Sequence, residues 1–250
     1  MAGELFRYPT LYNDSRVRAY YRFNAGALLK DSTANGYDLT NGNSVAEGFG
    51  IWGGVADFSN SNTNKYLRVA SNLGVTNSVS VVLRVKLLTE VASGSYTFCQ
   101  FYNANNGRHI RIYYDYNSGT RRIRFVSDRA DIAGVECTYN ITLGTSGIYT
   151  VILTFDNSTG ATIGYLDGSS VANVTVSGNG STAYSSVLTL GAVYNIANSA
   201  IENPASCLID DTWVLNGVLT PTEITNFQSF TAPNWKNMLT NQSIHRSNYY

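Results

Sequence analysis

Arginine and tyrosine side chains alternate with apolar ones along residues 108–126, in a pattern that predicts a β-hairpin. If its turn is centred on Ser118-Gly119, Tyr113 lies opposite Arg124 and Asp115 lies opposite Arg122. The apolar residues then share the other side of the hairpin, which supports this register. The polar side presents a set of candidate ligand-binding residues: Arg111, Tyr113, Arg122 and Arg124.

These residue types suit sugar recognition. A tyrosine ring can stack on the apolar face of a sugar, and an arginine can donate forked hydrogen bonds to hydroxyls or carboxylates. The alternative is a solvated sheet face that carries cross-strand ion pairs, such as Asp115 with Arg122. Both interpretations stay open at the level of sequence.

Catalytic motifs are scarce, and we expect the chain not to be an enzyme. There is no Gly-x-Ser-x-Gly elbow, and the chain has only two histidines, His109 and His245. Asp128, Asp131 and Glu136 form an acidic cluster of the kind that glycoside hydrolysis needs, but they flank Gly134 in a predicted loop, where exposed acids are common. No Cys/His metal spacing and no phosphate-binding glycine loop is present.

The composition favours a single large all-β domain. The 250 residues include 44% hydrophobic and only 14% charged residues, with 18 tyrosines, 22 glycines and 4 prolines. Their formal net charge is zero, so nothing steers the whole molecule towards nucleic acid. No apolar run has the length of a signal peptide or a membrane span, so we expect no membrane insertion.

Three cysteines, Cys99, Cys137 and Cys207, lie on strand-like segments. An odd number cannot form a fully paired disulfide framework. We therefore expect three buried free thiols.

The elements that must position the candidate residues are strands with clear two-residue alternation. Residues 78–87 place Val79, Val81, Leu83, Val85 and Leu87 on one face. Residues 207–215 alternate in the same way, which predicts one face made of Cys207, Ile209, Asp211, Trp213 and Leu215. After Gly217, the sequence Thr220-Pro221-Thr222-Glu223 predicts a helix that starts with a capping box and ends before Pro233.

Several motifs occur in a fixed order along the chain. They are the opening strand 16–23, the turn Asp-Ser-Thr-Ala-Asn-Gly at 31–36, the strand pair 49–58 and 65–67, the long strand 78–87, the hairpin turn Asp167-Gly168, and the closing strand and helix 207–224. This order resembles the laminin-G-like (LamG-like, concanavalin A-like) jelly-roll domain family. The resemblance implies an all-β, two-sheet antiparallel jelly-roll sandwich with a short C-terminal helix, in which the strand at 16–23 pairs with the strand at 207–215.

The same resemblance raises the question of a structural calcium ion. Asp31 and Asp210 occupy places where relatives sometimes carry acidic groups near such an ion, and calcium prefers several oxygen ligands together. Ser59-Asn60 departs from the Asp-Gly that the family often has there. Asp31 is equally well explained as the side-chain cap of its own turn. No cofactor is firmly implied.

The sequence predicts three parts: a lead-in at 1–15, a LamG-like domain at 16–230, and a polar C-terminal segment at 231–250 that attaches the chain to a partner. We expect a non-catalytic recognition or adhesion module that binds glycan at a cell surface or in an extracellular or phage-virion assembly. The alternative is a structural virion or filament decoration subunit without ligand, and a glycoside-active enzyme is the weakest option. The expected partners are glycan or other subunits, including copies of this chain, and the expected location is extracellular or on a virion surface.

Overall fold

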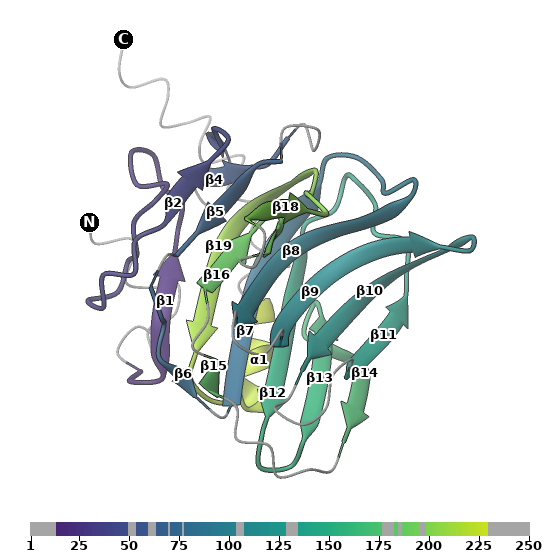
Figure 1. Ribbon diagram of the computed structural model, residues 1–250. Coiled ribbons are helices and arrows are strands. Elements are labelled where there is room, and N and C mark those ends of the chain that lie inside the picture. The colour runs from purple at the N-terminus through teal and green to yellow at the C-terminus, as the bar shows by residue number, and fades with distance from the viewer. Residues whose placement is uncertain are drawn as a thin grey trace.

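The computed structural model describes residues 14–49, 54–59, 64–69, 71–76, 78–103, 108–128, 135–176, 183–184, 187–195 and 199–229. Two large antiparallel sheets pack face to face (Figure 1). The described part of the chain adds one short C-terminal helix and no helix that is long and apolar enough to cross a membrane. The predicted all-β jelly-roll sandwich is therefore confirmed.

The larger sheet has eight strands. In spatial order they are β14 (Ser169–Thr175), β13 (Ala161–Leu166), β12 (Tyr149–Asp156), β7 (Ser78–Leu87), β19 (Cys207–Leu215), β4 (Gly54–Asp57) and β3 (Ala46–Phe49), and β1 (Val17–Tyr21) also pairs with β19. The antiparallel β1–β19 pairing sets Tyr20 opposite Trp213. It confirms that the opening and closing strands of the sequence belong to one domain.

The second sheet has seven strands. In spatial order they are β11 (Glu136–Asn140), β10 (Thr120–Ser127), β9 (Arg108–Asn117), β8 (Gly94–Asn103), β16 (Val187–Leu190), β5 (Tyr66–Arg68) and β2 (Thr40–Gly42). Two small ribbons complete the described strands: β6 (Val75–Thr76) with β15 (Ala183–Tyr184), and β17 (Val193–Asn195) with β18 (Ala200–Glu202). The β17–β18 ribbon lies beside β8 and β16 (Figure 1).

The register of the β9–β10 hairpin is the predicted one. Tyr113 pairs with Arg124 and Asp115 pairs with Arg122. The two turn residues, Ser118 and Gly119, have φ values of 51° and 84°. Two successive positive φ values give the turn the twist that matches the flanking strands.

The core lies between the two sheets and is made by the inward side of each alternating strand. All five predicted residues of β7, from Val79 to Leu87, are buried in it. The three cysteines are also buried and free, as the sequence predicts. Burial raises the pKa of the Cys137 thiol to about 11, so this group is neutral at physiological pH.

The alternation along β19 is interrupted, and here the prediction of a single face from Cys207 to Leu215 is wrong. Ile209 pairs with Val85 and Thr212 with Leu83, so two residues, Asp210 and Asp211, stand opposite one residue of β7. This bulge reverses the facing of every residue after it. Cys207 and Ile209 therefore point into the core, whereas Trp213 and Leu215 belong to a separate apolar cluster on the outer face.

Helix α1 (Pro221–Ser229) covers that outer face, behind the eight-stranded sheet in Figure 1. Its start is the predicted capping box: the Thr220 backbone N–H donates to Glu223 Oε2 at 2.7 Å, and the Glu223 N–H donates to Thr220 Oγ1 at 3.3 Å. Ile224 and Phe227 pack on Trp213 and its neighbours. The lead-in before residue 14 and the segment after Ser229 lie outside the described residues, as does the predicted stop before Pro233.

Candidate functional site

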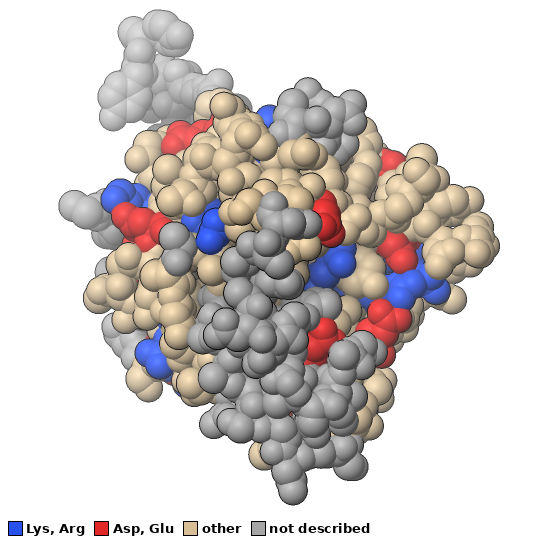
Figure 2. All heavy atoms as spheres, in the orientation of Figure 1, with Lys and Arg blue, Asp and Glu red and all other residues tan. Residues whose placement is uncertain are grey.

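The four predicted ligand-binding residues lie together on the outer face of the seven-stranded sheet, on β9 and β10. Their inward neighbours, such as Ile112 and Phe125, are buried in the core, so the alternating residues point outward. Figure 2 shows positive and negative side chains close together over this part of the molecule. The structure thus brings all four residues onto one surface but gives them different surroundings.

Two of the arginines are neutralised by ion pairs. Arg122 Nε lies 3.0 Å from Asp115 Oδ1, and Arg124 Nε lies 3.0 Å from Asp115 Oδ2. Arg124 also contacts Glu136 on β11. Burial disfavours the charge of Arg124, but Tyr113 and the two carboxylates outweigh it, so the pKa of Arg124 is raised. For these two residues, the structure has the cross-strand pairs of the alternative interpretation.

The ring of Tyr113 is packed against two arginines. The guanidinium carbon of Arg111 lies 4.1 Å from the centre of the Tyr113 ring, and that of Arg124 lies 5.6 Å from it. The hydroxyl donates to Glu136 Oε2 at 3.3 Å, and burial raises the pKa of Tyr113, which keeps the hydroxyl protonated. The ring face under Arg111 is therefore occupied, and a sugar cannot stack there unless Arg111 moves.

Arg111 differs from the other two arginines. Its Nε and Nη2 donate to the Thr97 hydroxyl at 3.1 and 2.6 Å, and Nη2 also lies 3.4 Å from the Ser95 hydroxyl. No carboxylate in the described part of the chain lies within 4.0 Å of its guanidinium. Burial lowers the pKa of Arg111, while Tyr113 and the charge of Glu202 oppose this shift without reversing it. A guanidinium nevertheless stays charged at neutral pH, so Arg111 is a cation on this face with no ion pair to a described carboxylate.

Sequence reasoning missed the partners that β8 and β5 bring to this face. Thr97 stands opposite Tyr113, and Gln100 stands opposite Arg111. Consecutive strands are usually neighbours, which was a usable signal for β8 beside β9. However, β8 shifts register between Thr97 and Cys99, so its simple alternation misassigns the outward residues. Arg68 on β5 had no local signal, because β16 links it to β8 from a distant part of the sequence.

The acidic cluster around residue 134 is described only at its two ends, Asp128 and Glu136. Asp128 is buried, with 3% of its surface exposed, and Glu136 is the first residue of strand β11. Asp131 and Gly134 lie outside the described residues. The strand position of Glu136 follows from its pairing with Val126. Glu136 is thereby placed beside Arg124 rather than beside a second free acid.

Asp31 acts as the cap of its own turn. Its Oδ1 accepts hydrogen bonds from the backbone N–H groups of Tyr20 and Thr33 at 3.1 and 3.0 Å. Its Oδ2 accepts from the Thr33 hydroxyl at 2.7 Å and from the Tyr37 N–H at 3.0 Å. Asp210 is buried in the β19 bulge. Within the described ranges no group of three or more acidic, His or Cys side chains could hold a metal.

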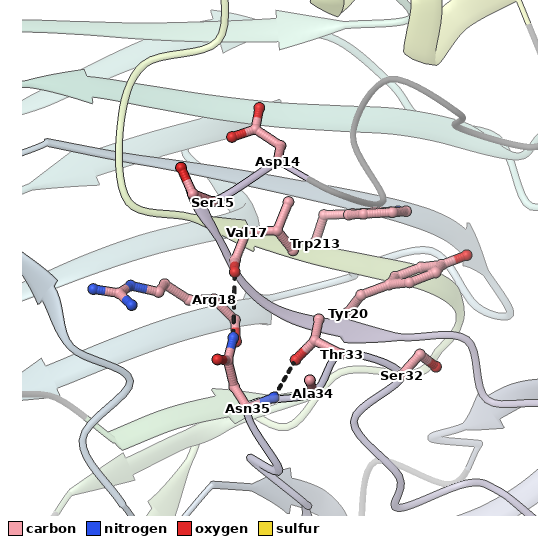
Figure 3. A pocket seen from close by; sticks show the side chains of 10 residues that line it. All are labelled: Asp14, Ser15, Val17, Arg18, Tyr20, Ser32, Thr33, Ala34, Asn35 and Trp213. Atoms are coloured by element: carbon pink, nitrogen blue, oxygen red, sulfur yellow. Dashed lines mark hydrogen bonds between the residues drawn. The ribbon is translucent and has the colours of Figure 1, made fainter.

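A pocket of about 340 Å³ lies between β1 and the turn that Asp31 caps (Figure 3). Its aromatic side is the stacked pair Tyr20 and Trp213, whose ring centres are 3.6 Å apart. Asn35 crosses the pocket wall and donates to the backbone oxygens of Val17 and Arg18 at 3.3 and 2.9 Å. The Asn35 hydrogen bonds hold the turn against β1. The contacts of the pocket residues are therefore explained by the fold.

Comparison with known proteins identifies solved structures of similar architecture. Domain 4 of AbnA, a GH43 extracellular arabinanase from Geobacillus stearothermophilus, matches with a TM-score of 0.65 and 21% identity, over 85% of this chain and 98% of that domain. The receptor-binding domain of botulinum neurotoxin type G matches with a TM-score of 0.63 and 14% identity, over 86% of this chain but 51% of that one. A SAP-like pentraxin from Limulus polyphemus matches with a TM-score of 0.53 and 15% identity, over 66% of this chain and 76% of its own. At these identities the likeness shows the fold.

No curated protein matches the sequence. The family model Laminin_G_3, described as the concanavalin A-like lectin/glucanases superfamily, matches residues 60–225. This match runs from before β5 into α1 and includes β7–β10 and β19, the strands that form both outer faces. The chain therefore belongs to the concanavalin A-like lectin/glucanase superfamily, as a member of its Laminin_G_3 family.

Proposed function

We propose that this chain is a non-catalytic glycan-binding module and that it binds through the outer face of the seven-stranded sheet. The observation that carries the proposal is the Arg111 guanidinium, held in place by Thr97, Ser95 and the Tyr113 ring but left without a counter-ion among the described residues. Such a group is a fixed donor for sugar hydroxyls or carboxylates.

The structural relatives support a carbohydrate ligand. The solved structure of AbnA domain 4 is a complex with arabinotriose, and it matches this chain along almost its whole length. A botulinum neurotoxin DC binding domain that matches 87% of this chain was solved in complex with SialylT. A shared fold does not transfer a ligand, so the assignment to this chain depends on its own polar sheet face.

The carboxylates on this face favour binding over catalysis. Asp115 and Glu136 both contact Arg124, and Asp115 also contacts Arg122. A glycosidase needs one carboxyl group that is free to donate a proton to the leaving group, whereas the carboxylates of Asp115 and Glu136 are already engaged by arginines. We therefore propose that neither residue is an acid catalyst.

A glycan array with the purified chain tests the proposal, followed by calorimetric titration of the best oligosaccharide. We expect Arg111→Met to weaken binding at least tenfold. Arg121→Gln is a matched control, because Arg121 is a β10 arginine that contacts Tyr116 and Glu90 away from this face. Ala34→Tyr would obstruct the pocket of Figure 3. Loss of binding in that variant, with Arg111→Met unaffected, would move the site to the pocket and contradict the proposal.

Enzymatic activity is tested separately. The same oligosaccharides, incubated with the chain for many hours, should show no new reducing ends. Turnover that disappears in Asp128→Asn or Glu136→Gln would overturn the non-catalytic assignment.

We also propose that the module is displayed in an extracellular or virion assembly and that residues 231–250 attach it to a partner. The motivation is the sequence alone: Trp235, Tyr249 and Tyr250 lie in a polar segment with no periodic face. Truncation after Phe230 should leave the melting temperature unchanged and abolish docking or self-association, as measured by light scattering. A melting temperature lower by several degrees with unchanged assembly would show instead that the segment belongs to the fold. Assembly without any glycan binding would support the purely structural alternative.

A further inference from the structure

The arginines of the outer face fall into two groups. Arg122 and Arg124 are tied to Asp115 and Glu136. Arg111 and Arg68 have no ion pair to any described carboxylate, and each lies over a tyrosine ring instead, Arg111 over Tyr113 and Arg68 over Tyr194. The guanidinium-to-ring distances are similar, at 4.1 and 4.0 Å. Two cations on this face are thus positioned without being neutralised by the described residues.

These two arginines stand at the ends of one cross-strand row. Arg68 pairs with Thr189, Thr189 pairs with Gln100, and Gln100 pairs with Arg111. All four residues lie on the outward side, because the alternating residues Leu67, Leu190, Cys99 and Ile112 are in the core. Neighbouring strands are about 4.8 Å apart, so the backbones of Arg68 and Arg111 are separated by roughly 14 Å. One oligosaccharide is long enough to reach both.

Gln100, in the middle of the row, has an unsatisfied acceptor. Only 3% of its surface is exposed, and its Oε1 accepts no hydrogen bond from the described residues. A buried polar atom without a partner destabilises the fold, so such atoms are rare in folded proteins. Its position beside Arg111 places an acceptor next to a cation: the oxygen can accept from a ligand hydroxyl, and the guanidinium can donate to a ligand anion.

We propose that Arg111 and Gln100 form a binding site, here called the anionic seat, for a sugar that bears a carboxylate. This proposal rests on the proposed glycan-binding function. Arg111 Nη1, which donates to no described residue, binds the carboxylate, while Nε and Nη2 stay anchored on Thr97. Gln100 Oε1 accepts a hydroxyl of the same sugar after a local rearrangement that exposes this oxygen, which is buried in the structure. Arg68 stands at the other end of the row, beyond the buried Thr189, for the next anionic unit. Arg124 is not part of this seat, because Asp115 and Glu136 already neutralise its charge.

The test compares matched ligands that differ only in charge. Trigalacturonic acid and its methyl ester form one pair, and sialyllactose and its methyl ester form another; dextran sulfate reports any general attraction to polyanions. We also expect free D-glucuronate at tens of millimolar to raise the melting temperature of the wild type more than D-glucose does. The anionic member of each pair that binds should bind at least tenfold more tightly at low salt, and the difference should shrink at high salt.

Three variants test which residues produce the preference for the anionic ligand. Arg111→Met should abolish the preference for the anionic ligand, Arg111→Lys should keep part of it, and Gln100→Met should weaken both members of a pair without reducing stability. Arg121→Gln should behave as the wild type.

The outcomes separate this inference from the proposed function. Glycan binding without preference for the carboxylated ligand, or a preference that survives Arg111→Met, would overturn the anionic seat but leave the glycan-binding module intact. Tighter binding of dextran sulfate than of every carboxylated ligand would assign the site to sulfate. If no glycan on the array binds and glucuronate leaves the melting temperature unchanged, the proposed function and this inference both fail.

Discussion

The two outer faces of this sandwich are built in opposite ways. The face of the eight-stranded sheet is covered by α1 and an apolar cluster that includes Val82, Ile152 and Trp213. The face of the seven-stranded sheet instead presents arginines, tyrosines and hydroxyl groups. The outward residues of both faces come from strands whose other residues fill the shared core, so the difference does not come from the core. The difference lies in what covers each face. A helix of the same chain covers the eight-stranded sheet, and we propose that a ligand binds to the seven-stranded sheet.

One arginine from each face shows the same contrast. On the eight-stranded sheet, Arg84 Nη1 lies 2.9 Å from Asp211 Oδ2, and both side chains are almost fully buried. Asp211 also accepts a hydrogen bond from the Tyr20 hydroxyl at 3.2 Å. On the seven-stranded sheet, Arg111 has hydroxyl and ring contacts but no described carboxylate. The first arrangement fixes the fold, whereas the second leaves a charge available.

The largest expected loss of stability follows from breaking the buried ion pair between Arg84 and Asp211 on the eight-stranded sheet. Asp211→Ala removes the carboxylate that pairs with the buried Arg84 and should lower the free energy of unfolding by about 4 kcal/mol. Urea denaturation monitored by tryptophan fluorescence measures this change. A double variant, Arg84→Met with Asp211→Ala, should recover much of the stability, because no charge is then left buried. A single variant as stable as the wild type would mean that the ion pair is not a structural element.

Removal of the helix contact should be the next largest effect. Phe227→Ala deletes a fully buried ring that packs edge-on against Trp213, with ring centres 6.0 Å apart, and should lower stability by about 3 kcal/mol. Glycan binding by the other sheet should not change at temperatures where the variant is folded. Loss of binding without unfolding would show that the two faces are coupled, against the division drawn here.

The sharpest form of the comparison uses the same substitution on both faces. Arg111→Met should lower the free energy of unfolding by only about 1 kcal/mol, because the Thr97 and Ser95 hydroxyls lose a donor but no buried carboxylate is left unpaired. Arg84→Met removes the partner of Asp211 and should be strongly destabilising. Parallel thermal denaturation of the two variants measures the difference. Equal destabilisation would mean that Arg111 has a structural counter-ion.

The capping box should give a smaller effect. Thr220→Ala removes the hydroxyl that accepts from the Glu223 N–H and should lower stability by about 1 kcal/mol. Thr220→Ser keeps the hydroxyl and serves as the control. A loss of similar size in Thr220→Ser would point to the methyl group rather than the cap.

The smallest expected effect is on the pH dependence of stability that arises from Asp14, Arg16 and Glu223 at the start of α1. Although burial acts in the other direction, the Thr220 N–H and Arg16 hold the pKa of Glu223 below its usual value, and Arg16 does the same for Asp14. A carboxyl whose folded pKa is lowered stabilises the fold above its unfolded pKa, and this stabilisation disappears as pH falls through the folded value. Stability should therefore decline below about pH 4.5, and Glu223→Gln should flatten part of that decline. Denaturation curves between pH 3 and pH 7 measure it.

Local sequence determined those features that depend on neighbours along the chain. Two-residue alternation and the turn at Ser118-Gly119 sufficed for the register that sets Tyr113 opposite Arg124, because a hairpin joins residues that are close in sequence. The capping box at Thr220 is likewise contained in four residues. The burial of Cys99, Cys137 and Cys207 followed from their places on alternating strands.

Only the tertiary structure decided which of those residues share an environment. The bulge at Asp210-Asp211 turns Trp213 to the outer face, and no local pattern announces it, because its partner, Arg84, lies more than a hundred residues earlier. The row from Arg68 to Arg111 joins four strands that are scattered through the sequence. The pairing of charges on the outer face of the seven-stranded sheet could not be read from the sequence either. Alternation places Arg111, Arg122 and Arg124 on one side, but which of them meets a carboxylate depends on the strand that packs next to each, and strand neighbours are set by the fold as a whole.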